Sequence, residues 1–362
     1  MAQDSAMIAV QVGHQVDLIR FGASLGANVN PYLSSISKQI REILTRNEYI
    51  NTAKLRDEIV REVTAVMNKE LGAYTAGLES DLNPLISSEV AFQYEVVNAA
   101  VGKGVAVARP TIAETKKLIN KVPMSLNGKA YYAADRIGNY APTQISAVEQ
   151  VIVSGWSTGQ TTTQISRAIT GTANVRGVIQ TSQNSAYSLA KDLTSHISSM
   201  AKTEVGKQNN DLVIGEKAVV TLDSKTSHIC QDIGSQDSGG KEYYYDKDGY
   251  NFPRSPYHHN CRTTMTYILA DEYRDISDED QSRPAVVNGK VIQVDATTNW
   301  MDLAKQYPSL ARQSLGASRA AVLNEMTASE FTKVAYNRMN QPITLDQLAR
   351  NNATAAKVLT AE

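Results

Sequence analysis

The sequence predicts an α+β protein in which long N-terminal helices precede a small antiparallel sheet packed on a helix, followed by a mixed C-terminal tail. Two observations lead to this fold class. Apolar residues recur at three- and four-residue steps through much of residues 32–101 and 142–209, which is the period of an amphipathic helix. After residue 211 the pattern changes to short runs of β-branched and aromatic residues, which favours strands.

Composition and charge exclude several classes of protein. The chain has 362 residues, enough for two or three domains, and a formal net charge of −1. This balance argues against a dedicated nucleic-acid binder, because phosphate contacts require clustered Lys and Arg. We expect no membrane span and no secretory signal, since no apolar run approaches about 18 residues and the N-terminus lacks a basic region before an apolar one. Two cysteines fit a protein made in a reducing cytosol.

The N-terminal third is predicted to be an arm followed by helices. Residues 1–31 are small and polar, and they suit either a tail without order or an extended arm that orders against a neighbouring subunit. Residues 32–141 form a helical region with a connector, and Asn83-Pro84 is expected to open its third helix. In the connector, Thr111 and Glu114 have the spacing of a capping box.

The middle of the chain is predicted to pack a sheet on one helix. Residues 185–207 carry the most regular apolar stripe, and Glu204 lies at its end. We expect Glu204 to tie the helix to the following sheet, with a catalytic acid as the alternative. Strands are expected in three stretches, the first broken by a turn at Gly215: 212–222, 243–245 and 264–269.

The C-terminal part is expected to begin with an acidic linker at residues 275–280. Asn288-Gly289 between β-branched runs then predicts a hairpin with a type I′ turn. A helix follows over residues 300–310, with Pro308 near its end.

One segment, Thr221 to Thr264, gathers both thiols and most imidazoles of the chain: Cys230, Cys261, His228, His258 and His259. The loop between the cysteines has too few apolar residues to be held by burial. We therefore expect side-chain or metal contacts at its base.

Three chemical states of this cluster stay open. The first is a zinc ion bound by Cys230, His258 and Cys261, with His228 or His259 as a fourth ligand. The second is a disulfide between the two cysteines, formed in an oxidising environment. The third has no metal, with two buried thiols beside hydrogen-bonded imidazoles. The cofactor is accordingly predicted to be none or one structural zinc.

Catalysis is not expected from the residues. Cys230 and His258 could form a thiol–imidazole pair, but no oxyanion hole and no third orienting group can be recognised around them. Gly102-x-Gly104 lacks the third glycine and the preceding strand of a phosphate-binding loop. We therefore predict that the protein is not an enzyme.

An ordered set of residues resembles the signature of the phage Mu F-type head morphogenesis proteins, also called minor head or minor capsid proteins. It begins with Lys202, Thr203 and Glu204, where that family usually has Arg-Thr-Glu. Further positions follow in order: Asp223, Thr226, Cys230, Pro256, His258, Asn260, Cys261 and Arg262. Ser227 and Thr263 stand where the family has its first and last cysteines, so a four-thiol zinc site is excluded.

The resemblance implies a domain division and a function. Residues 142–270 would be the Mu F-type domain, and 271–362 a C-terminal linker and helical tail. The protein would be a structural minor head protein of a tailed phage, acting in head assembly or genome delivery. Its partners would be the portal protein and other head proteins, with self-association and contact with packaged DNA as additions. It would lie at the portal vertex of the virion, after assembly in the host cytoplasm.

Two alternatives to this function remain. One is an internal protein that is ejected with the DNA. The other is a thiol- or zinc-dependent enzyme.

Overall fold

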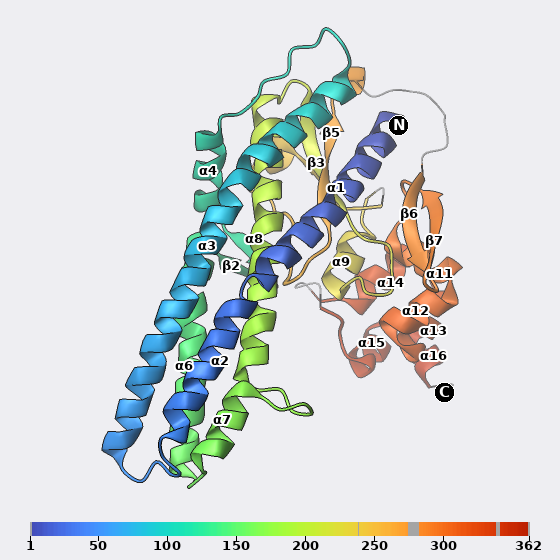
Figure 1. Ribbon diagram of the computed structural model, residues 1–362. Coiled ribbons are helices and arrows are strands. Elements are labelled where there is room, and N and C mark those ends of the chain that lie inside the picture. The colour runs from blue at the N-terminus through green and yellow to red at the C-terminus, as the bar shows by residue number, and fades with distance from the viewer. Residues whose placement is uncertain (1, 238, 274–281, 338–340, 361–362) are drawn as a thin grey trace. The chain divides into compact units, whose positions relative to one another are not determined.

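The computed structural model describes residues 2–237, 239–273, 282–337 and 341–360. Its long N-terminal helices and small antiparallel sheets confirm the predicted α+β class (Figure 1). The helices are α1 (Ala2–Ala27), α2 (Asn30–Thr45), α3 (Ala53–Val101), α4 (Ile112–Lys121), α5 (Ala133–Gly138), α6 (Tyr140–Ser157), α7 (Thr162–Thr170), α8 (Val178–Gln208), α9 (His228–Ile233), α10 (Tyr245–Asp248), α11 (Trp300–Gln306), α12 (Pro308–Leu315), α13 (Ala317–Asn324), α14 (Ala328–Ala335), α15 (Leu345–Asn351) and α16 (Ala353–Leu359). The strands are β1 (Met124–Leu126), β2 (Lys129–Tyr131), β3 (Val213–Val219), β4 (Glu242–Tyr244), β5 (Thr264–Leu269), β6 (Ser282–Val287) and β7 (Lys290–Asp295).

Contacts divide the chain into two compact units. Unit 1 comprises Met1–Asp17, Ile86–Ala130 and Ser195–Glu362, and unit 2 comprises Leu18–Leu85 and Tyr131–Thr194. The linear boundaries predicted at residues 31, 141 and 270 stay predictions, because each unit is assembled from separate stretches of the chain. Within the described residues, no helix combines the length and the apolar content that a membrane span requires.

Unit 2 is a helical bundle whose core follows from the apolar stripes. In α2, the buried residues recur at helical spacing: Leu33, Ile36, Ile40, Ile43 and Leu44. Tyr74 of α3 packs edge-on against Tyr140 of α6, with ring centroids 5.5 Å apart. Gly171 ends α7 with a φ of 76°, because glycine tolerates this left-handed backbone.

The predicted N-terminal arm is wrong, since residues 2–27 form helix α1. Three of its polar residues, Gln11, His14 and Gln15, are buried or half-buried. Gln11 donates from Nε2 to Oε1 of Gln93 at 2.8 Å, and His14 Nε2 lies 2.6 Å from Glu89 Oε1. Polar side chains with partners on α3 therefore interrupt the row of buried apolar residues, among them Met7 and Ile8, by which a buried helix is usually recognised.

The predicted start of a helix at Asn83-Pro84 is also wrong, because α3 continues through both residues. Proline inside a helix removes one backbone hydrogen bond and costs about 3 kcal/mol. Leu82, Leu85 and Ile86 are buried around it, and burying each side chain contributes about 1.5–3 kcal/mol. The packing on both sides of Pro84 thus offsets the missing bond.

The central sheet of unit 1 has the order β4-β3-β5, with antiparallel pairing throughout. The turn predicted at Gly215 is wrong, because this residue lies inside β3, where the register with β5 shifts. A Cβ at Gly215 would lie 2.2 Å from the Tyr243 carbonyl oxygen, whose strand is β4. Only glycine, which has no Cβ, allows β4 to approach this closely. From the sequence alone, a glycine required by a neighbouring strand looks the same as a glycine in a turn.

The predicted packing of the sheet on the helix of residues 185–207 is confirmed within unit 1. Lys202 of α8 is 1% exposed and donates from Nζ to the Met265 carbonyl oxygen at 2.7 Å. The Tyr267 hydroxyl donates to the Lys202 carbonyl oxygen at 3.1 Å. Glu204 does not make the predicted sheet contact and instead accepts from Gln208 of its own helix at 3.1 Å.

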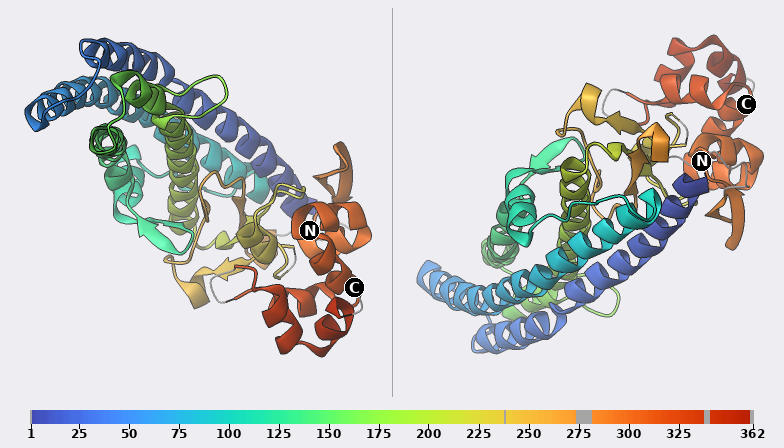
Figure 2. Two further views of the ribbon diagram at one scale, coloured as in Figure 1. Left: turned by 90° about the horizontal axis from the view of Figure 1, so that it is seen from below. Right: turned by 90° about the horizontal axis from the view of Figure 1, so that it is seen from above.

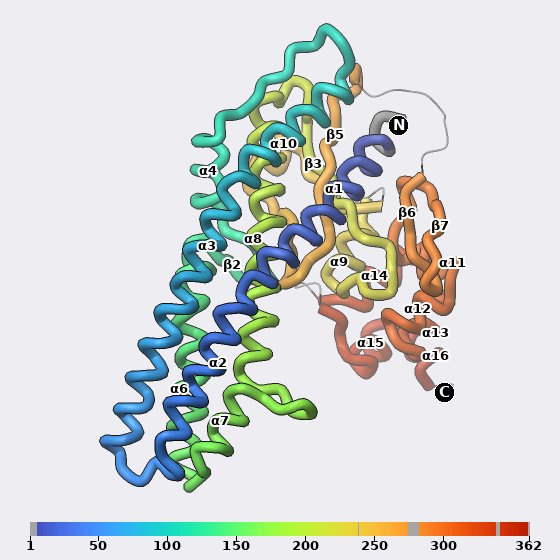
Figure 3. Tube along the Cα trace, viewed as in Figure 1, coloured from blue at the N-terminus to red at the C-terminus, as the bar shows by residue number. Residues whose placement is uncertain are grey.

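The C-terminal elements gather around one core in unit 1 (Figure 3). The predicted hairpin is confirmed as β6–β7, with positive φ at Asn288 (53°) and Gly289 (75°), as a type I′ turn requires. The helix predicted over residues 300–310 ends earlier, at Gln306, and Pro308 near that end begins α12, a position that suits proline because its missing N–H is not needed there. The predicted acidic linker, residues 275–280, lies outside the described residues.

The buried histidine of α8 leads to a prediction about pH. His196 donates from Nε2 to the Ile119 carbonyl oxygen at 3.0 Å, since a carbonyl can only accept, and burial lowers the pKa of His196 to about 4. The unfolded chain takes up this proton near pH 6.5, whereas the folded chain does not. The neutral, buried His196 therefore contributes about 3 kcal/mol to the free energy of unfolding. This contribution is complete above pH 6.5 and is lost as the pH falls to about 4. Urea unfolding of wild type and His196→Gln across this range should show that the variant lacks this loss, and equal pH slopes would contradict it.

Candidate metal centre

The first side of the site is the start of helix α9. Ser227 caps this helix, and its Oγ accepts from the Cys230 backbone N–H at 3.4 Å. The cap fixes the first turn, so the Cys230 thiol points away from solvent and is 2% exposed. A serine one turn before a cysteine therefore positions the thiol.

The second side is the loop that leads into β5. The Cys261 N–H donates to the His258 carbonyl oxygen at 3.1 Å, which closes a tight turn. Asn260 lies inside this turn with a φ of 58°, a left-handed conformation that asparagine tolerates. The turn brings the imidazole of His258 and the thiol of Cys261 to the same side of the loop.

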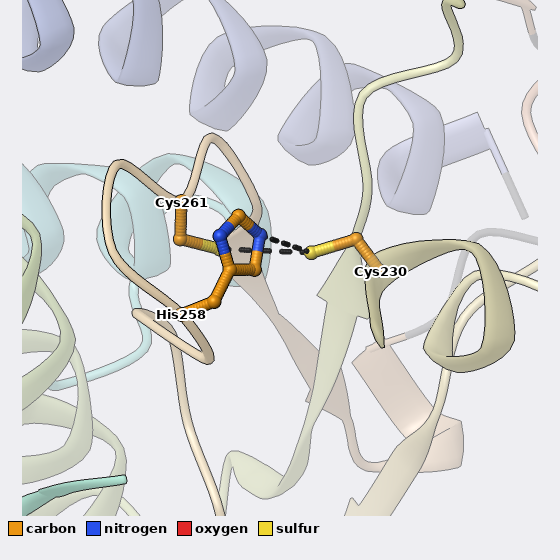
Figure 4. A group of neighbouring side chains, drawn as sticks. All are labelled: Cys230, His258 and Cys261. Atoms are coloured by element: carbon orange, nitrogen blue, oxygen red, sulfur yellow. Dashed lines mark hydrogen bonds between the residues drawn. The ribbon is translucent and has the colours of Figure 1, made fainter. Parts of the chain in front are cut away.

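The three side chains meet in one cluster (Figure 4). Cys230 Sγ lies 3.2 Å from His258 Nε2 and 3.7 Å from Cys261 Sγ. The candidate ligand atoms of all three residues lie within 4.8 Å of one another. Both cysteines are free and buried, so the structure has the pair as thiols without a disulfide.

The tautomer of His258 follows from the hydrogen bond of its Nδ1 atom. Nδ1 lies 2.9 Å from the carbonyl oxygen of His259, which can only accept. Nδ1 therefore carries the proton, and the lone pair of Nε2 faces the thiols. Metal-binding histidines are usually oriented in this way by a carbonyl on the far nitrogen.

Two hydroxyl groups surround the cluster, and they belong to the residues that stand in place of family cysteines. Ser227 Oγ lies 2.7 Å from His258 Nε2. Thr263 donates from Oγ1 to Cys230 Sγ at 3.0 Å. Ser227 thus lies beside the ligand atoms, and the Thr263 hydroxyl supports the Cys230 sulfur by a hydrogen bond.

The two thiols titrate as a pair. Burial raises the pKa of the Cys261 thiol, but hydrogen bonds with Cys230 and His258 outweigh it and hold that pKa well below its usual value. The hydrogen bond with Cys261, followed by burial, raises the pKa of Cys230 well above its usual value. One thiolate is therefore stable here, and a second needs a cation to balance it.

An ion pair closes the base of the loop. Arg262 donates from both terminal nitrogens to the two carboxylate oxygens of Asp223, at 2.6 and 2.7 Å. Such a two-bond pair fixes orientation as well as distance. Thr226 donates from Oγ1 to the Thr221 carbonyl oxygen at 2.5 Å, which holds the strand end beside it. The signature residues Asp223, Thr226 and Arg262 thus support the cluster without joining it.

Other predicted site residues lie elsewhere. His228 does not belong to the cluster of Cys230, His258 and Cys261. Its Nδ1 instead lies 3.4 Å from Gln231 Oε1. His259 contributes its carbonyl oxygen rather than a ring nitrogen. Pro256 follows a cis peptide bond in the same loop, and Lys202 and Thr203 lie on the sheet side of α8, where Thr203 bonds Glu216 at 3.3 Å.

Sequence reasoning missed a buried ion pair beside the site. Arg254 and Glu216 have side chains that are 4% and 0% exposed, and Arg254 donates from Nε and a terminal nitrogen to the Glu216 carboxylate. The hydroxyl of Tyr245 lies 3.2 Å from the same carboxylate. The signal available was Glu216, a charged residue in the middle of an apolar strand.

Comparisons with known proteins give no relative from which a role for these residues could be taken. No protein-family model, curated protein or solved structure matches the chain.

Proposed function

We propose that this chain is a structural minor head protein of a tailed phage, associated with the portal vertex and acting in head assembly or genome delivery. The observation that supports it is the convergence of signature residues distant in sequence. Asp223 pairs with Arg262, and Cys230 meets His258 and Cys261, although 28 or more positions separate the partners. Residues that match the signature only by chance would not be expected to contact one another in the structure.

The site supports a role in scaffolding. Cys230 and Cys261 are 2% and 4% exposed, which suits a clamp within the fold better than a group that must reach a substrate. We call Cys230, His258 and Cys261 the latch. It joins the start of α9 to the loop before β5, and the Asp223–Arg262 pair braces the same loop.

Capsids made with and without the portal protein test the proposal. We expect the chain to be present at low copy number in normal procapsids and to be lost from those that lack the portal. Immunoblotting against a major head protein measures the ratio. Equal incorporation in both would count against a place at the vertex, and loss of the chain on DNA release would favour the ejected-protein alternative.

One observation favours a second candidate, a thiol-dependent enzyme. The Cys230 thiol lies 3.2 Å from His258 Nε2, which is within the range of a nucleophile and its base. Alkylating the native particle separates the two functions. An enzyme loses function when its thiol is modified, whereas a structural latch buried to this degree resists the reagent and leaves infectivity unchanged.

We further propose that one structural zinc ion closes the latch. Two thiolates at about 2.3 Å from a tetrahedral zinc lie about 3.8 Å apart, and the two sulfur atoms here are 3.7 Å apart. Cys230, Cys261 and Nε2 of His258 would be three ligands. Ser227, or a water beside it, is placed for the fourth position. The ion would supply the positive charge that lets both thiols ionise.

Thr263 provides a sharp test of the zinc proposal. Thr263→Val removes the donor to Cys230 Sγ, and losing such a supporting bond usually weakens metal binding about 10–100-fold. Thr266→Val is the matched control, because Thr266 lies in β5 three residues after Thr263 and its buried hydroxyl has no hydrogen-bond partner among the described residues. Competition with a chelating dye measures both affinities. Equal zinc affinities in the two variants would contradict the role of the Thr263 hydroxyl in stabilising Cys230 as a ligand.

A further inference from the structure

Gln144 occupies a core position of unit 2 without a hydrogen-bond partner. It stands in the buried stripe of α6, one turn after Tyr140 and one turn before Val148. Gln144 is 6% exposed, and its amide has no hydrogen-bond partner among the described residues. Burying an unpaired amide costs free energy that an apolar side chain at this position would not cost. The amide therefore indicates a ligand that supplies the missing hydrogen bonds.

Gln144 lines a cavity of about 300 Å³ that is formed by α5, α6 and α8. The parts of these helices that form it belong to unit 2, and Figure 2 shows them in green and yellow-green. Each helix contributes to the lining, with Arg136 on α5, Thr143 on α6 and Leu189 on α8. Cavities of this size begin the range in which small ligands and short segments bind. The unpaired amide thus lies at a space that can hold a ligand.

Three hydroxyl groups around the cavity already have partners. Those of Thr143 and Ser185 donate to carbonyl oxygens one turn earlier in their own helices, at 2.7 and 3.0 Å. The Tyr140 hydroxyl donates to the Ser182 carbonyl oxygen at 2.9 Å. Among the buried residues that line the cavity, Gln144 is therefore the one whose polar group is left for a ligand.

The charges around the cavity disfavour an anionic ligand. Asp135 and Arg136 are the charged residues of the lining. Arg136 donates from a terminal nitrogen to Asp192 Oδ2 at 3.0 Å, and Asp192 is 1% exposed. The cation of the lining is thus already paired with a buried carboxylate, and a second carboxylate lies beside it. A phosphate or a carboxylate would meet an excess of negative charge here.

The chemistry of the amide points to a peptide backbone. A carboxamide presents an acceptor and a donor side by side. In an extended polypeptide, the N–H and C=O of one residue point to the same side, as they do in the hydrogen-bonded pairs of an antiparallel sheet. The edge of a nucleobase offers a similar pair, but a nucleotide also brings the phosphate that Asp135 and Asp192 disfavour.

We propose that the cavity formed by α5, α6 and α8 binds an extended segment of another polypeptide through its backbone. The N–H and C=O of one residue of that segment pair with the carboxamide of Gln144. Recognition through main-chain hydrogen bonds accepts many side chains in the bound segment. The proposal is independent of the head role, because it rests on residues of unit 2 alone.

Titration of the full-length protein with a capped residue tests the site. The probe is N-acetyl-leucine N-methylamide, which is neutral and carries the N–H and C=O of one residue. We expect a dissociation constant on the order of 1 mM for a ligand of this size. The same compound methylated on the leucine nitrogen lacks the donor and should bind at least about tenfold more weakly. Methyl NMR signals of Leu189, which lines the cavity, measure both affinities.

Gln144→Met separates ligand binding from a structural role. Methionine has nearly the length of glutamine and no amide, so the variant without probe should be at least as stable as the wild type. Its affinity for the probe should fall at least about tenfold. Gln150→Met is the matched control, because Gln150 is an exposed residue of the same helix, and its affinity should equal that of the wild type.

Other results overturn the proposal. Leu189 signals that do not respond to the probe, or equal affinity in Gln144→Met and the wild type, would show that Gln144 does not bind a peptide group. A loss of stability in Gln144→Met would show that its amide already has a partner in the fold. Tighter binding of uridine monophosphate than of the probe would show a nucleobase site instead.

Discussion

Substituting Cys261 by Ala is expected to abolish zinc binding and to destabilise the protein by about 4 kcal/mol at a zinc concentration a thousand times the dissociation constant. The physical reason is that a metal bound only by the folded state adds its binding free energy to folding. Cys261 is a ligand of the proposed zinc site, and its Sγ lies 3.7 Å from Cys230 Sγ. Thermal unfolding of wild type with and without a chelator, beside the variant, measures the effect.

His228→Ala is the matched control for this change. His228 is an imidazole in the same segment, but its ring bonds Gln231 and does not reach the latch. We expect this variant to keep its zinc and to respond to a chelator as the wild type does. If both variants lose zinc alike, the ligand assignment fails. If a chelator changes nothing in the wild type, the latch works without metal.

Substituting Glu216 by Gln is expected to destabilise the protein by about 3–5 kcal/mol. Breaking one partner of a buried ion pair leaves the other charge buried without compensation. Here the guanidinium of Arg254 would be left 4% exposed, and the carboxylate contacts of Thr203 and Tyr245 would weaken with it. Urea unfolding measures the loss.

Glu242→Gln provides the comparison on the same sheet. Glu242 pairs with Lys217 at 3.6 Å, and these side chains are 21% and 13% exposed. A pair that reaches solvent contributes at most about 1 kcal/mol. Similar losses in the two variants would show that the Arg254–Glu216 pair does not hold the sheet and its loop together.

Local signals explain what could be predicted from the sequence. The capping box of Thr111 and Glu114 is present, because its two hydrogen bonds join residues three positions apart. The Asn288-Gly289 turn also depends on two adjacent residues. The latch cysteines and His258 could be predicted for a different reason, since few other side chains have the chemistry to clamp a polar loop.

Partners distant in sequence explain what could not be predicted. Helix α1 buries Gln11 against Gln93, 82 positions away, so its polar composition indicated an arm. Gly215 is required by the approach of β4, which the local sequence does not contain. His228 and Cys230 are two positions apart in α9, and residues at that spacing point in different directions on a helix.

Zinc K-edge absorption of the purified protein, combined with its metal content, tests the latch most directly. The account predicts one zinc per chain with two sulfur ligands at about 2.3 Å and nitrogen or oxygen ligands at about 2.0–2.1 Å. A protein without zinc, or a zinc shell without sulfur, would contradict it.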